Sequence, residues 1–245
     1  MASKAADLVI QTKRVSKMYP MGDQELRVLK GVDVDIRRGE YISITGPSGS
    51  GKTTLLDVLS GLLRPTSGEV LINGKPISDM DDNELAQVRG KTIGFVFQTF
   101  NLINRMTALE NVMLPLWFQG IDPIERKERA EKVLRDVGLG DRMDHRPNEL
   151  SGGQRQRVAI ARALATEPDV IVADEPTGNL DSVAGATILN ILDELHTKQG
   201  KTILIVTHER YVAERAEHII TIKDGEIVSK EAVRKKKSKI RGNYK

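Results

Sequence analysis

The chain has 245 residues, with 37 Lys or Arg and 34 Asp or Glu, and a net charge of +3. Residues 230–245 hold eight basic residues and one Glu, a net of +7, which leaves −4 for the rest. Nucleic-acid binding across the fold needs a basic face, so this distribution disfavours specific binding of nucleic acid. The tail is either a solvated appendage or a separate electrostatic contact.

The remaining totals describe an ordinary globular chain, long enough for one large domain or two small ones. It has no Cys, which excludes disulfides and thiolate chemistry and suits a reducing compartment. No apolar run approaches the ~18 residues of a membrane helix, and the N-terminal residues contain no signal-peptide pattern. We therefore expect a cytoplasmic protein. The four histidines (His145, His196, His208 and His218) lack metal-site spacing.

The first part of the chain alternates strands with a helix. Period-two patterns predict strands over 32–36 and 41–45, and a helix over 51–63 follows a glycine-rich loop. Further strands are predicted over 69–74 and 91–98. This alternation indicates an α/β fold.

Residues 107–165 contain no strand pattern and predict helices over 107–117, 124–137 and 153–165. The segment therefore forms a helical block within the chain.

Strands return after this block. The apolar, β-branched runs 169–174 and 201–208 suit strands of a parallel sheet that is covered on both faces. The helical pattern 184–198 between them supplies the crossover that parallel strands require. Residues 218–229 predict two short strands around the turn Asp224–Gly225.

The segment GPSGSGKT (46–53) matches a phosphate-binding loop between a strand and a helix. Its glycines let backbone N–H groups face one anion, and the helix dipole adds positive potential. Lys52 is placed to reach the β- and γ-phosphates, Ser48 to donate to the γ-phosphate, and Thr53 to ligate Mg²⁺. The alternative is a glycine-rich turn that matches by chance.

The segment DVIVADEP (169–176) is an apolar strand that ends in two acids. After a phosphate loop, Asp174 is placed to orient Mg²⁺ and Glu175 to polarise the attacking water. The alternative is an acid that caps a following helix.

The segment LSGGQ (150–154) precedes a clear helix. Ser151 is a candidate N-cap, and the two glycines expose backbone N–H groups to an anion. One ATP already has its phosphate loop, so this second anion surface suggests that it completes the nucleotide site of another copy. The alternative is a plain helix cap with a glycine hinge.

These three motifs, in this order, closely resemble the nucleotide-binding subunit of ATP-binding-cassette (ABC) transporters over about residues 8–228. The resemblance implies one α/β domain, a P-loop NTPase cassette with a RecA-like parallel-sheet core, an antiparallel β subdomain and a helical subdomain inserted at about 100–160. Residues 229–245 would form a basic, flexible tail.

The resemblance also assigns roles to residues outside the three motifs. Tyr19 resembles the aromatic that stacks on adenine, and Gln98 resembles the residue that contacts Mg²⁺ and water. Asp181 resembles an acid that crosses a dimer interface, and His208, at the end of a strand, resembles the histidine that holds the γ-phosphate and Glu175. The alternative for Tyr19 is a core tyrosine, and without the family resemblance a strand-end histidine such as His208 is more often structural.

The mechanism implied is ATP hydrolysis by a homodimer that pairs head to tail around two ATP–Mg²⁺ units. ATP would close the pair, and hydrolysis would open it. The expected catalytic residues are Glu175, His208 and Gln98, and the expected Mg²⁺ ligands are Thr53, Gln98 and Asp174. The expected nucleotide contacts are Tyr19, Gly46, Pro47, Ser48, Gly49, Ser50, Gly51, Lys52, Thr53, Thr54, Ser151, Gly152, Gly153, Gln154 and Asp181.

Within the family, the strings 92–116 and 173–182 are most similar to the macrolide-exporter, lipoprotein-release and cell-division subgroup. Such a cassette would drive a separate integral membrane permease subunit from the cytoplasmic face, with the basic tail near anionic lipid. The helical block would dock that subunit or simply pack internally. The alternative function is a soluble regulatory or assembly ATPase. Candidate docking residues are Phe100, Leu102, Met106, Leu116, Trp117 and Phe118.

Overall fold

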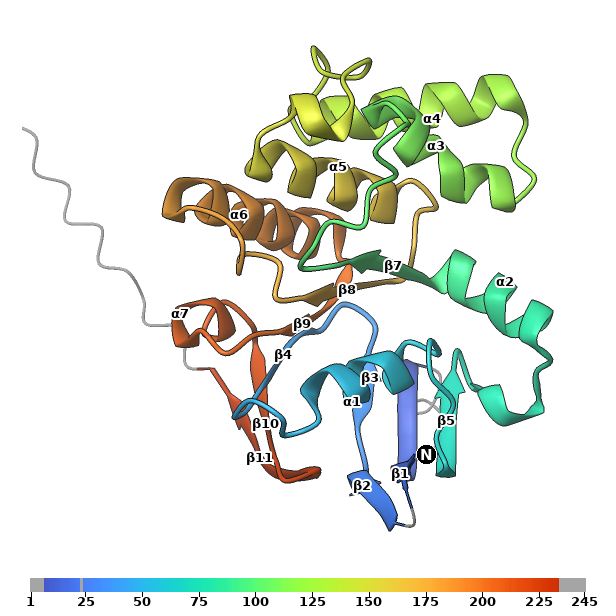
Figure 1. Cartoon of the computed structure of the whole chain (residues 1–245), viewed down its shortest axis with the longest axis vertical. Helices are drawn as coiled ribbons and strands as arrows, with labels where there is room; N and C mark the ends of the chain where they lie inside the picture. The colour runs from blue at the N-terminus through green and yellow to red at the C-terminus, as the bar shows by residue number, and fades with distance from the viewer. Residues whose placement is uncertain (1–6, 23, 234–245) are drawn as a thin grey trace, which may run out of the picture.

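The computed structural model describes residues 7–22 and 24–233, which form two β-sheets with helices between and around them (Figure 1). The first sheet is antiparallel, in the order β2-β1-β5-β6, with β3 paired to β1. Its strands are β1 (Leu8–Met21), β2 (Gln24–Val32), β3 (Asp35–Arg37), β5 (Ser67–Ile72) and β6 (Lys75–Pro76).

The second sheet has the order β11-β10-β4-β9-β8-β7, and every neighbouring pair except β10–β11 is parallel. Strand β9 lies between β4 and β8, so the loops that follow these strands meet at one edge of the sheet. Ligands of open α/β sheets bind at this carboxyl edge. The strands are β4 (Tyr41–Thr45), β7 (Ile93–Val96), β8 (Val170–Asp174), β9 (Thr202–Val206), β10 (His218–Lys223) and β11 (Glu226–Ala232).

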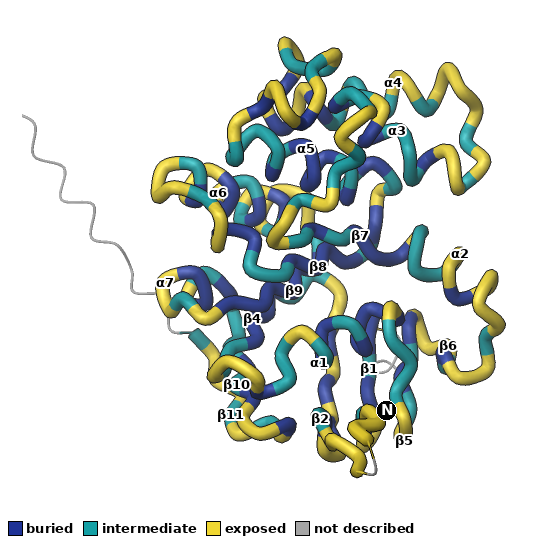
Figure 2. The backbone as a smooth tube through the Cα atoms, in the orientation of Figure 1, coloured by how far each residue is buried: buried dark blue, intermediate teal, exposed yellow. Residues whose placement is uncertain are grey.

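Helix α1 (Lys52–Leu59) contacts strands of both sheets, and the buried side chains there form one apolar cluster. A second cluster joins the other face of the parallel sheet to α3 (Ala108–Phe118), α4 (Pro123–Asp136), α5 (Gly152–Leu164) and α6 (Ser182–Gln199). Figure 2 shows the buried backbone concentrated along β4, β8 and β9. The chain thus forms layers around the parallel sheet, with α3, α4 and α5 at one end.

The helices begin at the polar residues that the sequence offers as caps. Thr107 and Glu110 form a reciprocal capping box at α3, and Asp122 precedes Pro123 at the start of α4. Ser151 caps α5, and Asp181 accepts two backbone N–H groups at the start of α6. These caps satisfy donors that have no partner within a helix.

The fold class predicted from the sequence is confirmed, with differences in individual elements. The sequence patterns predict neither β1 nor α2 (Asp82–Thr92). Because α2 continues through Thr92, the strand expected over 91–98 is limited to β7. Strand β9 ends at Val206, so His208 lies beyond it rather than at its end.

The described part of the chain also includes three short elements: α7 (Arg210–Ala213) and the 3₁₀ helices η2 (Ile77–Asp79) and η3 (Pro147–Glu149). Strand β11 runs to Ala232, so the hairpin includes the first residues of the segment predicted as a tail. Residues 234–245 lie outside the described part. Over the described residues, no helix is both long enough and apolar enough to cross a membrane.

Candidate functional site

A cavity of about 410 Å³ opens at the carboxyl edge of the parallel sheet, where the loops after β4 and β8 meet. It brings together the phosphate loop, Gln98 after β7, and the two acids at the end of β8. The lining residues are Val28, Ser48, Gly49, Gly51, Lys52, Thr53, Thr54, Gln98, Asp174, Glu175 and Val206.

The phosphate loop is packed tightly against the end of β10. A Cβ added to Gly46 would lie 2.1 Å from the carbonyl oxygen of Ile222, so only glycine fits there. Within the loop, the Lys52 Nζ donates to the carbonyl oxygens of Gly46 and Pro47, at 2.9 and 2.8 Å. The ammonium group is therefore held directly over the loop, where an anion would be bound.

Negative charge is concentrated opposite this lysine. Burial raises the pKa of Asp174, and the neighbouring carboxylates of Glu175 and Asp57 raise it further, while Lys52 lowers it. Burial also raises the pKa of Asp57. The sequence analysis missed Asp57, although it lies four residues after Thr53 and therefore on the same face of α1.

Glu175 has an unusual backbone and an incompletely paired side chain. Its φ is 44°, in the left-handed region that a non-glycine residue seldom adopts, and its N–H donates to the carbonyl oxygen of Val206 at 2.9 Å. The Oε1 lies 2.8 Å from the Nδ1 of His208. The Oε2 is buried and has no protein hydrogen-bond partner among the described residues. Strain and unpaired polar atoms of this kind are typical of functional sites.

The residues predicted to hold Mg²⁺ fit such an ion. Thr53, Gln98 and Asp174 line the same cavity, and the acids there carry charge that the protein only partly neutralises. Among the described residues there is no cluster of three or more His, Cys, Asp or Glu able to hold a metal. Mg²⁺ commonly needs only one or two carboxylates, with phosphates and waters completing its coordination.

Tyr19 lies near the end of β1 and outside the residues that line the cavity. It pairs with Leu26 on β2, and its ring is 37% exposed. The Nζ of Lys17 lies 5.3 Å from the ring centroid and donates to the carbonyl oxygen of Arg64. A partly exposed aromatic residue at this position is consistent with a stacking role.

The second anion surface lies apart from the cavity. Ser151 caps α5 through the backbone N–H of Gln154, and neither residue lines the cavity. Gly152 and Gly153 pack close to Leu180 and to Ala184 of α6, so the start of α5 lies beside the start of α6. Asp181 caps α6 at this junction. The two segments predicted to bind anions are therefore separate within one chain.

Gln156 is a further polar residue that the sequence analysis missed. It is fully buried on α5, and its Nε2 donates to the carbonyl oxygens of Pro176, at 2.9 Å, and Phe97, at 3.5 Å. It thereby ties together the segments that carry Glu175 and Gln98. A glutamine on a helix face otherwise formed by residues such as Ala159 and Ile160 was a detectable signal.

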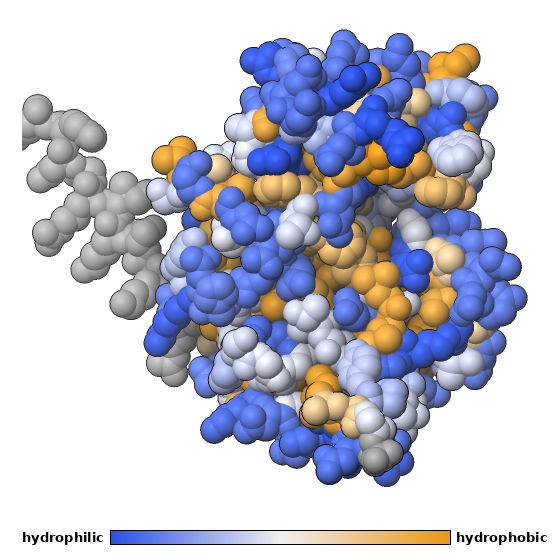
Figure 3. Space-filling view, in the orientation of Figure 1, coloured by the Kyte–Doolittle hydropathy of each residue, from blue (hydrophilic) through white to orange (hydrophobic). Residues whose placement is uncertain are grey.

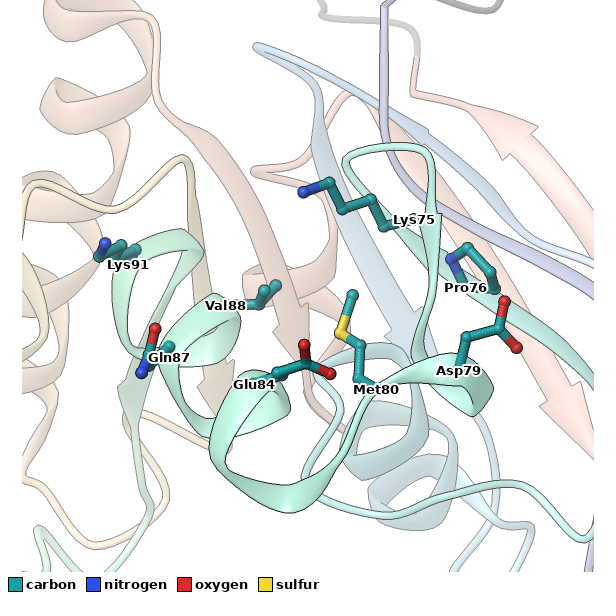
Figure 4. A pocket seen from close by; sticks show the side chains of 8 residues that line it. All are labelled: Lys75, Pro76, Asp79, Met80, Glu84, Gln87, Val88 and Lys91. Atoms are coloured by element: carbon teal, nitrogen blue, oxygen red, sulfur yellow. The ribbon is translucent and has the colours of Figure 1, made fainter.

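A second hollow, of about 440 Å³, lies between β6, η2 and α2 (Figure 4). Met80 and Val88 form its apolar part, and two lysines and two acids surround them. None of the predicted site residues lines this hollow. Its mixed charges do not define a ligand.

Comparison with known proteins places the chain among cassette proteins. A family profile described as ABC transporter matches residues 29–178. An uncharacterized ABC transporter ATP-binding protein of Thermotoga maritima is 53% identical over 219 residues, which cover 89% of this chain and 93% of that protein. The macrolide export ATP-binding/permease protein MacB of Bartonella quintana is 47% identical over 99% of this chain. The chain covers only 36% of that protein.

A solved structure agrees with this assignment. It is described as a dimeric post-hydrolysis state of the ATP-binding cassette MJ0796 bound to ADP and Pi, from Methanocaldococcus jannaschii. The two structures match with a TM-score of 0.85 at 48% sequence identity, over 92% of this chain and 99% of that one.

The contact between Glu175 and His208 predicts a specific titration. The hydrogen bond and charge of Glu175 raise the pKa of His208 above its ordinary 6.5. The charged pair is therefore fully formed below pH 6.5 and is lost as the pH rises through the raised pKa. In Glu175→Gln the His208 midpoint should fall toward 6.5, as measured by NMR titration of the imidazole. The other three histidines are internal controls. An unmoved His208 midpoint would contradict the contact.

Proposed function

This chain belongs to the ABC transporter family of ATP-binding proteins and is an ATPase, and from that premise we propose how its residues divide the work. The observation that carries the proposal is the state of the Glu175 carboxylate. One oxygen is held by His208, and the other is buried and has no partner in the described part of the protein, while the residue lines the phosphate-loop cavity. That arrangement suits a group that orients and polarises a water molecule.

The phosphate loop binds the triphosphate through its backbone N–H groups and through Lys52 and Ser48. Thr53, Gln98 and Asp174 hold Mg²⁺, which supplies positive charge to the phosphate oxygens when it is bound. Glu175 aligns the attacking water, and His208 fixes the orientation of that carboxylate. Tyr19 stacks on the adenine.

The ATP-bound form is a head-to-tail homodimer. Ser151, Gly152 and Gly153 form an anion surface that does not reach the cavity of their own chain. Each ATP is therefore completed by these residues from a second copy. Closure on ATP and opening after hydrolysis convert the reaction into movement.

The movement is transmitted to a separate membrane permease subunit, as in exporters or mechanotransmission systems, with the cassette at the cytoplasmic face. The similarity to macrolide export proteins supports export as the proposed direction of transport. At the end of α3, the rings of Trp117 and Phe118 are tilted by 39° with their centroids 5.2 Å apart, and the two residues are 60% and 76% exposed. Exposed aromatic pairs of this kind favour a protein partner.

A hollow of about 740 Å³ lies beside Phe118, between α2 and α3, and includes Arg89 and Lys91. It offers space for an acidic or amphipathic segment of the partner. Leu116 is fully buried and is removed from the set of predicted docking residues. The surface of this face is hollowed, with apolar side chains between the helical block and the antiparallel sheet (Figure 3).

Replacing Glu175 by Gln tests the hydrolytic role. The amide keeps the size of the side chain but cannot polarise water, so ATP binding should persist while turnover falls at least ~100-fold. Size-exclusion chromatography with ATP should show an accumulated dimer. Glu194→Gln, on the exposed side of α6, is the matched control. Unchanged turnover in Glu175→Gln would remove this residue from its role.

Ser151→Arg tests the head-to-tail arrangement. The long side chain at the start of α5 should block the dimer while leaving ATP binding to the monomer intact. Ser151→Ala removes the helix cap without adding bulk and costs about 1 kcal/mol of stability, so it separates the two effects. Light scattering and nucleotide titration provide the readouts. Equal loss of dimer and of monomer binding would argue against the interface.

Docking to a membrane subunit predicts that the aromatic pair contributes to assembly. Trp117→Ala with Phe118→Ala should reduce co-purification with the membrane subunit encoded beside this chain, because both side chains are exposed. Val228→Ala, a similarly exposed apolar residue on β11 and away from the helical block, is the control. Purification with soluble partners only would favour the alternative of a regulatory or assembly ATPase.

A further inference from the structure

The turn between β10 and β11 lies at a junction of three backbone segments. The N–H of Gly225 donates to the carbonyl oxygen of Ser50 in the phosphate loop, at 3.1 Å. The carbonyl oxygen of Gly225 accepts from the N–H of Lys30 on β2, at 2.9 Å. A single residue of the C-terminal hairpin therefore bridges the phosphate loop and the antiparallel sheet.

The three segments are in direct contact, without intervening side chains. A Cβ added to Gly225 would lie 2.4 Å from the carbonyl oxygen of Val28, and one added to Gly51 would lie 3.0 Å from the same oxygen. Gly225 also has a φ of +82°, which disfavours any other residue. Any larger group at this position must push β2 away from the phosphate loop, because backbone atoms cannot yield as a flexible side chain does.

The strand held in this way also carries the nucleoside end of the site. Val28 lines the phosphate-loop cavity, and Leu26 pairs with Tyr19 across the β1–β2 hairpin. A shift of β2 relative to Ser50 therefore changes the distance between the two ends at which ATP is held. In the described residues, strand β2 is at the edge of its own sheet, so the contact with the β10–β11 turn lies on the side where no strand of that sheet pairs with it.

We propose that the Asp224–Gly225 turn is a positioning element that sets the spacing between the phosphate loop and the Tyr19 hairpin, and so determines how well the phosphates and the base of one nucleotide are bound together. The inference rests on the proposed stacking of Tyr19 on adenine.

The chain contains a matched control turn. Asn73–Gly74 has the same left-handed geometry as Asp224–Gly225, with φ of 50° and 75° compared with 51° and 82°. A Cβ added to Gly74 meets nothing within 4 Å. Gly74→Ala therefore reproduces the backbone strain of Gly225→Ala without the contact on β2.

The test measures dissociation constants for ATP and for inorganic tripolyphosphate, which has no base to stack. Gly225→Ala should weaken ATP binding by up to about tenfold, the size of one lost aromatic contact, and leave tripolyphosphate binding unchanged. Gly74→Ala should change neither. In a Tyr19→Ala background, Gly225→Ala should have no further effect on ATP, because the contact that it misplaces is already absent.

A second variant tests the same proposal if Gly225→Ala does not fold. Lys30→Pro removes the N–H donor to Gly225 on an edge strand, where proline is tolerated. It should give the same selective loss of ATP affinity.

Additive losses in the double variant, or weaker tripolyphosphate binding, would show that the turn acts on the phosphate loop itself and would overturn the inference. An equal loss of ATP affinity in Gly74→Ala would also overturn it. Unchanged ATP binding in Tyr19→Ala alone would have a different meaning, since it would remove the proposed stacking role and the inference together.

Discussion

Asp174 ends β8 and Glu175 follows it, so two adjacent carboxylates lie in a partly buried cavity, with Asp57 close enough to add its own charge. Like charges at short range in a poorly solvated site repel one another, and the one lysine nearby is already bound to two loop carbonyls. The site therefore presents unbalanced charge and an unpaired oxygen to whatever enters it. The proposed coordination of a cation, polarisation of water and binding of phosphate all depend on this unbalanced charge.

The order of the parallel strands brings these charged side chains and the phosphate loop together. Because β4, β9 and β8 are parallel, the loops after β4 and β8 open at the same edge of the sheet. Gln156 hydrogen-bonds both the segment that carries Gln98 and the segment that carries Glu175. The second anion surface, at α5, is separate and faces another copy in the proposed assembly. Each copy would then contribute residues to both nucleotide sites, so that ATP binding and dimer formation would occur together.

The sequence predicts the parts of this site that are contiguous along the chain, but few of the contacts between distant segments. The phosphate loop and the acids after β8 are contiguous motifs with a known physical purpose, and their positions could be predicted. Strand β1 could not be, because register shifts after Val15 and Lys17 break its alternating pattern. Helix α2 buries only Leu85 and Thr92, so it has no apolar stripe to recognise. The burial of Leu116 and the role of Gly225 depend on contacts between distant segments, which no local pattern encodes.

The bridge made by Gly225 also has a consequence for the order of events during synthesis. The phosphate loop emerges from the ribosome early, but the hairpin that packs against it is made near the end of the described chain. Until then, Gly46 and Ser50 lack their contacts with Ile222 and Gly225, and the packing of α1 alone positions the antiparallel sheet against the loop. Long-range closure of this kind slows folding and leaves a nascent chain dependent on partners that shield its exposed surfaces.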